Sequence, residues 1–327
     1  MKIEFAVIGT NVITDKFLEA AKTVEDFHLK GVYSRSKEKA LAYAQKHGAE
    51  LVFDDLDELA ACDEIAAVYI ASPNSFHAPQ SIQMLKAKKH VLCEKPIASN
   101  SKELTKMKET ALENNVVLLE ALRSEFSPGF AAIKENLYKL GTVRRVSFQY
   151  CQYSSRYDKF KQGIIENAFN PEFSNGALMD IGVYCIHPMV ALFGKPDTVI
   201  SSSLKLSNGV DGAGTILLEY EGMQGELLYS KITNSNVPSQ IQGENGSMVI
   251  QEIQNPEVVT IYYKNGETEK LDIPKVDNNM FYETEALIRL IKEKEFDHAY
   301  LKNSLMEIAL MDEVRKQQEI VFPADSI

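Results

Sequence analysis

The chain has 327 residues, of which 46 are acidic and 35 are basic, so its formal net charge is −11. A single hydrophobic core stops growing at about 250–300 residues, so this length predicts two domains. The hydrophobic share of 45%, with 17 glycines and 11 prolines, is typical of a globular protein and excludes a disordered or collagen-like chain. The acidic excess argues against a nucleic-acid partner, which requires clustered lysine and arginine.

The sequence predicts neither a membrane span nor a secretion signal. Uninterrupted apolar runs, such as residues 116–119, are far shorter than the roughly 20 residues that cross a bilayer. Glu4 places a charge where a signal peptide is apolar. The four cysteines have neither the spacing of a metal site nor the density of a disulfide framework. We therefore expect a cytoplasmic protein with reduced cysteines, no bound metal and no membrane partner.

The first 120 residues alternate short β-type runs with amphipathic helical stretches, which is the pattern of parallel βαβ units. The predicted strands are residues 3–8, 29–33, 52–53, 68–71, 90–93 and 116–121. The predicted helices are residues 15–22, a helix capped by Ser36 and ended by Gly48, residues 56–61, a helix through Ile82 and Leu85, and residues 102–113. Six strands with crossover helices predict a doubly wound, dinucleotide-binding Rossmann domain.

After residue 128 the pattern changes to strands with few helices between them. The predicted strands are residues 143–150, 199–206, 214–220 and 225–230, and the predicted helices are a segment ending at residue 140, 175–192, 282–293 and 301–317. We therefore predict an α/β fold with an N-terminal Rossmann doubly wound parallel sheet in residues 1–122. Residues 123–327 are expected to form an α+β domain with a large, mostly antiparallel open sheet, for substrate binding and oligomerisation. Its last helices are free to pack back on the first domain.

A glycine follows the first predicted strand, at the position of a phosphate-binding loop. Residues 9–14 read Gly-Thr-Asn-Val-Ile-Thr and keep only the first glycine of a G-x-G-x-x-G motif. Asn11 replaces the second glycine, and asparagine tolerates left-handed backbone better than most residues. Thr14 replaces the third, whose small size serves helix packing. Taken alone, the run is equally compatible with an ordinary strand–helix turn, but its place in the first βα unit favours a cofactor site.

The end of the second predicted strand carries positive charge. An NAD-binding domain places an acidic residue there to bind the ribose hydroxyls. Residues 35–39 instead hold three basic side chains and one acidic side chain, a local charge of +2. Arg35 is suited to stack on adenine and hold a 2′-phosphate, with Ser34 and Ser36 as hydrogen-bond donors. The alternative is a solvated helix start. NADP(H) is the preferred cofactor, with NAD(H) as the alternative.

Three further segments resemble a known family. Residues 72–77 read Ser-Pro-Asn-Ser-Phe-His, residues 93–96 read Cys-Glu-Lys-Pro, and residues 170–184 read NPEFSNGALMDIGVY. In this order they resemble the family of glucose-fructose oxidoreductase, inositol dehydrogenase and MocA (Gfo/Idh/MocA) over nearly the whole chain. Tyr184 stands where inositol dehydrogenases carry histidine. The chain is therefore most similar to the branch that contains glucose-fructose oxidoreductase, xylose dehydrogenase and trans-dihydrodiol dehydrogenase.

The predicted cofactor residues follow the carboxyl ends of the strands, where ligands of doubly wound sheets bind. They are Gly9, Thr10, Asn11, Val12, Ile13, Ser34, Arg35, Ser72, Pro73, Asn74, His77, Glu94 and Lys95. For Glu94 and Lys95, the alternative is a surface ion pair. His77 is expected to line the crevice rather than to titrate. The resemblance implies that the Lys95–Pro96 peptide bond is cis.

The predicted catalytic residues are Lys95, Tyr184 and Asp180. Asp180, Tyr184 and His187 share one face of a helix by their spacing. Tyr184 is suited to exchange the proton of a substrate hydroxyl if Lys95 and the oxidised nicotinamide lower its pKa. Asp180 is expected to orient Lys95 or that hydroxyl. Gly182 inside the helix indicates that a group approaches closely there, and the nicotinamide ring is one candidate.

Four residues are candidates for substrate binding: Arg123, Tyr153, Arg156 and His187. Each has a plainer alternative, because the arginines are equally suited to solvent and a histidine on an apolar helix is more often packed in the core. Phe148 and Tyr150 are aromatic residues of the kind that line sugar pockets, and core packing explains them equally well.

The sequence thus predicts an NADP(H)-dependent oxidoreductase that transfers hydride to or from a CH–OH carbon of a sugar, polyol or cyclic diol. The resemblance implies a homodimer or higher homo-oligomer. One alternative is a cofactor-sensing regulatory protein of the same fold, with which the altered glycine loop is compatible. The presence of both Lys95 and Tyr184 favours the enzyme. Another alternative is a reductase of a CH–CH bond.

Overall fold

Two units, each with its own sheet, make up residues 2–326, which the computed structural model describes. The first unit comprises the residues up to Arg123 together with Val276–Leu305, and the second comprises Ser124–Lys275 together with the residues from Met306 onward. The first unit thus also contains Val276–Leu305, a C-terminal segment that lies within the predicted second domain, whose last helices were left free to pack back on the first. That segment contains a whole helix, α9 (Met280–Glu293).

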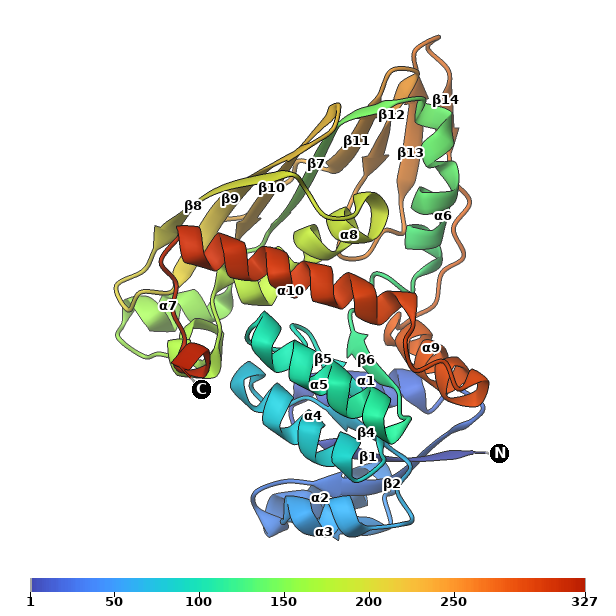
Figure 1. Ribbon diagram of the computed structural model, residues 1–327, viewed down its shortest axis with the longest axis vertical. Helices are drawn as coiled ribbons and strands as arrows, with labels where there is room; N and C mark the ends of the chain where they lie inside the picture. The colour runs from blue at the N-terminus through green and yellow to red at the C-terminus, as the bar shows by residue number, and fades with distance from the viewer. Residues whose placement is uncertain (1, 327) are drawn as a thin grey trace. The chain divides into compact units, whose positions relative to one another are not determined.

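The first unit contains a six-stranded parallel sheet, as predicted (Figure 1). Its strands are β1 (Ile3–Ile8), β2 (Phe27–Tyr33), β3 (Leu51–Phe53), β4 (Ala67–Ile70), β5 (His90–Glu94) and β6 (Leu118–Ala121). The strand order β3-β2-β1-β4-β5-β6 places the topological switch point between β1 and β4. Strands β4 and β6 are buried along their whole length, which explains why their residues are apolar except for Glu120 on β6.

Helices cover both faces of this sheet. They are α1 (Val12–Ala21), α2 (Lys37–His47), α3 (Leu56–Ala61), α4 (His77–Lys86), α5 (Ser101–Asn114) and α9, with the short 3-10 helix η1 (Asn74–Phe76) before α4. Helix α1 packs against α9, and α4 packs against α5. The predicted ends of α2 are confirmed: the Ser36 hydroxyl accepts a hydrogen bond from the Lys39 amide, and Gly48 ends the helix with a φ of +78°.

The second unit contains an eight-stranded sheet in the order β14-β13-β12-β11-β7-β10-β9-β8. Its strands are β7 (Val143–Cys151), β8 (Thr198–Lys205), β9 (Asp211–Tyr220), β10 (Met223–Ser230), β11 (Ser239–Gly243), β12 (Gly246–Ile250), β13 (Val259–Tyr263) and β14 (Thr268–Lys270). Within this sheet, and among the described residues, only β7 and β10 pair in parallel; its other pairs are antiparallel. The predicted open, mostly antiparallel sheet is confirmed.

A long apolar helix packs on this sheet. A π-turn (Leu178–Gly182) leads directly into α8 (Val183–Phe193), and both contact β10. The remaining helical segments are α6 (Pro128–Asn136), η2 (Leu137–Leu140), α7 (Ser155–Lys161), η3 (Asn167–Phe169), η4 (Pro171–Phe173) and η6 (Pro323–Ser326). Helix α10 (Ala299–Gln317) begins in the first unit and ends in the second.

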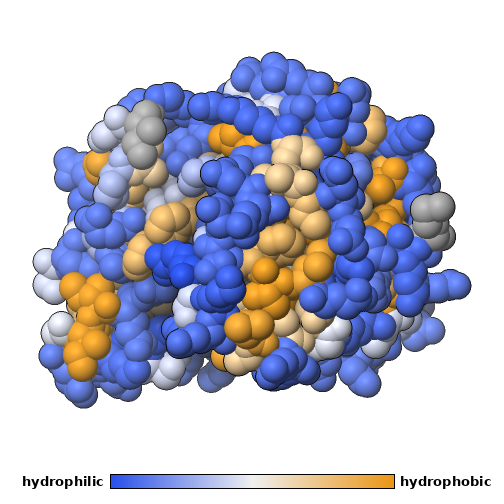
Figure 2. All heavy atoms as spheres, turned by 90° about the horizontal axis from the view of Figure 1, so that it is seen from below, coloured by the Kyte–Doolittle hydropathy of each residue, from blue (hydrophilic) through white to orange (hydrophobic). Residues whose placement is uncertain are grey.

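One helical segment of the described residues, Pro171–Phe193, is long and apolar enough to cross a membrane, although Glu172 and Asp180 interrupt its apolar sequence. In its most apolar window 78% is buried inside the protein. Burial of this extent is typical of a core helix. The face of the molecule drawn in Figure 2 is largely hydrophilic with separate apolar patches, in keeping with the 25% of residues that are charged.

Candidate active site

A cavity of about 560 Å³ lies in the first unit, beyond the carboxyl ends of β1, β2 and β4. The predicted cofactor residues that line it are Gly9, Thr10, Asn11, Ser34, Arg35, Ser72 and Pro73. Val12, Ile13, Asn74, His77, Glu94 and Lys95 are not among the lining residues. The cavity therefore has the position that the strand order predicts for a nucleotide.

The turn after β1 is built differently from a three-glycine loop. Gly9 has a φ of +112°, and a Cβ atom there would lie 2.8 Å from the Ala71 carbonyl oxygen, so only glycine fits. Asn11 has extended backbone with a φ of −101°, so its tolerance of left-handed backbone is not used here. Its side chain instead caps α1: Oδ1 accepts hydrogen bonds from the amides of Ile13 (2.9 Å) and Thr14 (3.2 Å). Its Nδ2 donates to the Ala71 carbonyl oxygen at 2.7 Å.

The cavity lining is positively charged. Arg35 and Lys39 both line it, and the Arg35 guanidinium lies 5.8 Å from the centre of the Phe76 ring. The hydroxyls of Ser34 and Ser36 come from the same loop. Of the described residues that line this cavity, none is Asp or Glu. Two cations with hydroxyl donors and no carboxylate form a donor set that suits a phosphate group.

His77 joins two loops instead of lining the cavity. The ring is 1% exposed, with Nε2 2.8 Å from the Ser72 carbonyl oxygen and Nδ1 2.9 Å from the Pro96 carbonyl oxygen. Burial lowers the pKa of His77. A buried histidine with a lowered pKa is consistent with the expectation that His77 does not titrate in the mechanism. Its side chain contacts the loops next to the cavity but does not line the cavity.

Glu94 faces the interior, which excludes the surface ion pair. Its Oε1 accepts a hydrogen bond from the Tyr69 hydroxyl at 2.5 Å, and its Oε2 accepts one from the Lys95 amide at 3.3 Å. Burial raises the pKa of Glu94, against the opposing effects of Tyr69, Lys95 and Arg123. The Lys95–Pro96 bond is cis, as the resemblance implied. Arg123 follows β6, and its charge acts on the buried Glu94 and Glu283 carboxyls.

In the second unit, Asp180 lies in the π-turn and binds a lysine. Its Oδ2 is 2.5 Å from Nζ of Lys231, which is the residue directly after β10. A single π-turn within a helix is frequent at functional sites, because the extra residue changes which side chains face outward. Lys231 was not among the predicted site residues, although a lysine at the end of a largely apolar strand is a signal that the sequence contains.

Tyr184 is the second residue of α8, directly after the π-turn, and is 8% exposed. Its ring contacts the Tyr150 ring edge to face, with centroids 5.7 Å apart. The structure also explains Gly182: a Cβ atom there would lie 3.2 Å from the Tyr229 ring, so the close neighbour is a strand of the protein's own sheet. The proposed nicotinamide contact is not needed to account for this glycine.

A polar cavity of about 620 Å³ adjoins Tyr150. Amide side chains dominate its lining; they are Gln149, Gln152, Asn234, Asn236, Gln251, Gln254 and Asn255. Each amide offers both donors and an acceptor, which matches the hydroxyl groups of an uncharged polyol or sugar. These residues were not predicted from the sequence, because scattered amides have no characteristic spacing. Phe148, by contrast, is fully buried and belongs to the core.

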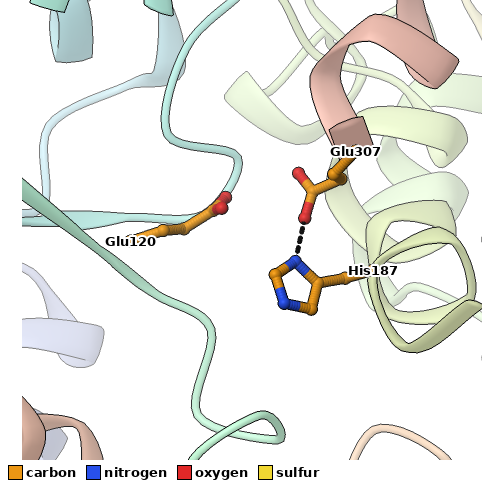
Figure 3. Close-up of side chains that lie close together, drawn as sticks. All are labelled: Glu120, His187 and Glu307. Carbon is orange, nitrogen blue, oxygen red and sulfur yellow. Dashed lines mark hydrogen bonds and ion pairs between the residues drawn. The ribbon is translucent and has the colours of Figure 1, made fainter. Parts of the chain in front are cut away.

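His187, a predicted substrate residue, lines neither of the two cavities described above. It is 1% exposed, and its ring lies between two carboxylates, with Nδ1 2.5 Å from Oε2 of Glu307 and Nε2 3.0 Å from Oε2 of Glu125. Figure 3 shows the contact with Glu307, which joins α8 to α10. Burial alone lowers the pKa of His187, but the two carboxylates outweigh it and hold this pKa well above its ordinary value.

The other two substrate candidates of the second unit lie around α7. The Tyr153 hydroxyl donates to Asp158 at 2.7 Å and accepts from Lys161 at 3.0 Å. Arg156 is exposed and lies 3.6 Å from Glu166. Neither lines either of the two cavities described above.

Together, a doubly wound domain with an anion-binding cavity and a second domain with a tyrosine, a carboxylate and a polar cavity define a nucleotide-dependent oxidoreductase. Residues 3–122 match the Gfo/Idh/MocA oxidoreductase family with its NAD-binding Rossmann fold, and residues 135–249 match the C-terminal domain of that family. The chain belongs to the Gfo/Idh/MocA oxidoreductase family, as the sequence motifs predicted.

Individual relatives agree over nearly the full length. The chain is 52% identical to the scyllo-inositol 2-dehydrogenase (NADP(+)) IolU of Bacillus subtilis, over 99% of each chain. It is 27% identical to a trans-1,2-dihydrobenzene-1,2-diol dehydrogenase of Xenopus tropicalis, over 99% of this chain and 100% of the relative. A 3-ketoreductase from Actinomadura kijaniata, solved in complex with TDP-benzene and NADP, superposes with a TM-score of 0.83 at 22% identity over 97% of this chain and 98% of that chain. The chain is therefore an NAD(P)-dependent oxidoreductase.

Proposed function

We propose that the protein is an NADP(H)-dependent dehydrogenase of a cyclic polyol such as an inositol, or of a closely related sugar. The observation that carries this proposal is the cavity at the end of β2, where Arg35 and Lys39 are present and carboxylates are absent among the described lining residues. The 52% identity to a relative that acts on scyllo-inositol with NADP(+) supports both the cofactor and the substrate class.

The residues present fit the nucleotide. Gly9 allows the close approach of β1 and β4 at the base of the cavity, and Arg35 with Ser34 supplies donors for a 2′-phosphate. When bound, the nicotinamide accepts or returns the hydride. Lys95, on the rigid turn with the cis bond, is assigned to hydrogen-bond the substrate oxygen.

The second unit supplies the proton chemistry. Tyr184 is assigned to exchange the proton of the reacting hydroxyl, and Asp180 to accept a hydrogen bond that orients the substrate. The cavity beside Tyr150 is assigned to the remaining ring hydroxyls, because most of its lining side chains are amides, which can both donate and accept hydrogen bonds. The carboxylates of Glu252 and Glu257 also line this cavity and disfavour an anionic substrate.

A screen of NADP(H)-linked absorbance tests this function. Purified protein is assayed with scyllo-inositol, other inositols, aldoses and trans-dihydrodiols, in both directions and with NADP or NAD. We expect the highest kcat/KM with an inositol and NADP+, and loss of turnover in Lys95→Ala. Turnover restricted to an enone, with no polyol accepted, would instead favour a reductase of CH–CH bonds. Tight cofactor binding without turnover of any compound would favour a sensor.

We further propose that the enzyme is a homodimer or higher homo-oligomer assembled through the open face of its large sheet. Ile200 on β8 and Leu217 on β9 are directly paired across the sheet and are 55% and 48% exposed. Arg145 and Glu226 form an ion pair at 2.8 Å on neighbouring strands and line a groove with them. A groove that combines apolar and paired charged residues suits a self-complementary interface. The four cysteines, none in a disulfide, support a reducing compartment such as the cytoplasm.

A further inference from the structure

Lys231 is a lysine buried beside a candidate active-site carboxylate. It is 3% exposed, and its Nζ lies 2.5 Å from Oδ2 of Asp180 and 2.8 Å from the Ala168 carbonyl oxygen. The same ammonium lies 4.7 Å from the centre of the Phe169 ring. Burial of an ammonium is costly unless opposite charge and acceptors surround it. The Lys231 ammonium is therefore enclosed by a carboxylate, a carbonyl oxygen and an aromatic ring, and the carboxylate is that of Asp180.

Two groups fix the position of Asp180: Lys231 binds its carboxylate, and Asp211 binds the backbone that precedes it. Its own side chain is 32% exposed, so part of the carboxylate remains accessible while Oδ2 contacts Lys231. The backbone that carries it is held by Asp211, whose carboxylate accepts hydrogen bonds from the amides of Ala177 (3.0 Å) and Leu178 (2.7 Å). A Cβ atom at Gly176 would lie 2.2 Å from Asp211 Oδ1, so the turn is packed tightly against this carboxylate.

We propose that Lys231 is a positioning residue for the dehydrogenase reaction: it keeps Asp180 ionised and fixes its carboxylate in the orientation that receives a substrate hydroxyl. This inference rests on the proposed function, in which Asp180 orients the substrate. An exposed aspartate rotates freely between side-chain rotamers, whereas an aspartate with one oxygen bound to a buried ammonium presents its other oxygen in one direction. Lys231 acts through Asp180 and is not assigned a contact with substrate.

The test is a double-mutant cycle on the full-length protein with Lys231→Met, Asp180→Asn and the combined variant. Lys139→Met is the matched control, because Lys139 is also ion-paired, at 2.7 Å to Glu269 in the same unit. We expect Lys231→Met to lower kcat/KM for scyllo-inositol by about 30-fold or more, as truncation of a buried charge pair does. The dissociation constant for NADP+, measured by calorimetry, is expected to remain within about twofold of the wild-type value, because Lys231 is not among the residues that line the cofactor cavity.

Two readouts separate positioning from a general structural role. The combined variant is expected to be no less active than Asp180→Asn alone, because Lys231 has nothing left to position once the carboxylate is gone. Loss of the ammonium also favours protonation of Asp180, so the acidic limb of the pH profile of kcat/KM is expected to move to higher pH in Lys231→Met. Lys139→Met is expected to leave the profile unchanged.

Losses that multiply in the combined variant, or an acidic limb that stays in place, would overturn the positioning role while leaving the dehydrogenase assignment intact. Full activity in Asp180→Asn would overturn the role of Asp180 and with it the inference. If the wild-type protein turns over no polyol, the proposed function fails. The inference is then decided by binding of scyllo-inositol to the NADPH complex: equal weakening in Lys231→Met and Asp180→Asn supports it, and unchanged binding in Lys231→Met overturns it.

Discussion

The Nδ1 atom of His187 lies 2.5 Å from Oε2 of Glu307, and both side chains are buried in the second unit. Glu125 approaches the other ring nitrogen at 3.0 Å. A single imidazole between two carboxylates is stable in a protein interior when it carries a positive charge. The histidine on the helix of Tyr184 is therefore a structural cation that joins α8 to α10.

His187→Gln is expected to lower the free energy of unfolding by about 3–5 kcal/mol, because it leaves buried carboxylates without their cation. The stabilisation should also depend on pH. The folded-state pKa of His187 is raised above its ordinary value of 6.5, so the contribution is complete below about pH 6.5 and is lost as the pH rises through the raised pKa. Urea unfolding at pH 6 and pH 9 should show a larger fall for the wild type than for His187→Gln.

His28→Gln provides the control for this titration. His28 also lies 2.5 Å from a carboxylate, Glu4, but both side chains are 36% exposed and the pair is screened by solvent. The control should cost less than about 1 kcal/mol. Equal dependence on pH in the wild type and in His187→Gln would show that the imidazole carries no charge in the folded protein.

Arg35→Ala is expected to weaken NADP+ binding about 10- to 100-fold and to leave NAD+ binding nearly unchanged, because a charge-assisted hydrogen bond contributes about 1.5–3 kcal/mol. Calorimetry is the suitable measurement, since the chain has no tryptophan to report binding. Lys37→Ala is the control: Lys37 is two residues away, exposed and 3.8 Å from Asp54, and it does not line the cavity. Tighter binding of NAD+ than NADP+ by the wild type would show that Arg35 does not select for the 2′-phosphate.

Tyr184→Phe is expected to lower kcat about 10²- to 10⁴-fold, the usual range for loss of a general acid or base. The ring and its edge-to-face contact with Tyr150 remain in this variant, so cofactor affinity and stability should change little. Tyr138→Phe, at a surface position that is 76% exposed, controls for loss of a hydroxyl. Full turnover in Tyr184→Phe across the pH range would show that another group moves the proton.

Asn11→Ala is expected to lower the free energy of unfolding by about 1–2 kcal/mol, because the cap of α1 is lost together with the bond to the Ala71 carbonyl. Asn11→Gly should cost only a few tenths of a kcal/mol as a cap. It also releases the amides of Ile13 and Thr14, which are donors that phosphate binds at helix starts. Thermal unfolding and NADP+ calorimetry of both variants measure these effects. NADP+ binding more than tenfold weaker in Asn11→Gly would show that the asparagine itself contributes to the site.

Leu217→Lys is expected to reduce the mass observed in sedimentation to that of one chain, because it places a charge beside the exposed Ile200 on the open sheet face. Leu41→Lys provides the control, since Leu41 is 46% exposed on α2 of the first unit. A wild type that sediments as a single chain would refute assembly through this face.

Local signals made most of the first unit predictable. The alternation of apolar runs and capped helices located its six strands, and Ser36 and Gly48 marked the ends of α2 as observed. The four strands β11–β14 were not predicted, because they are only three to five residues long and carry many polar residues. Strand pairing holds such segments in the sheet, and pairing between distant residues leaves no periodic trace in a short sequence.

Site residues were predictable where they directly follow a strand. They were less predictable where two side chains from distant segments of the chain come together. Arg35 and Lys95 were found by their place after β2 and β5. Lys231 is 51 residues from its partner Asp180, and Glu307 is 120 residues from His187. Helical spacing placed His187 on the helix of Tyr184, but it could not supply the two carboxylates that enclose it. Only tertiary packing decides which face of that helix meets solvent.

The imidazole of His77 connects two loops of the first unit, because it lies between the carbonyl oxygens of Ser72 and Pro96. The loop of Ser72 borders the nucleotide cavity, and the turn of Pro96 carries Lys95. This one ring therefore links the loop that borders the nucleotide cavity to the turn that carries Lys95. A substitution of His77 is accordingly expected to disturb both loops, although the side chain itself does not line the cavity.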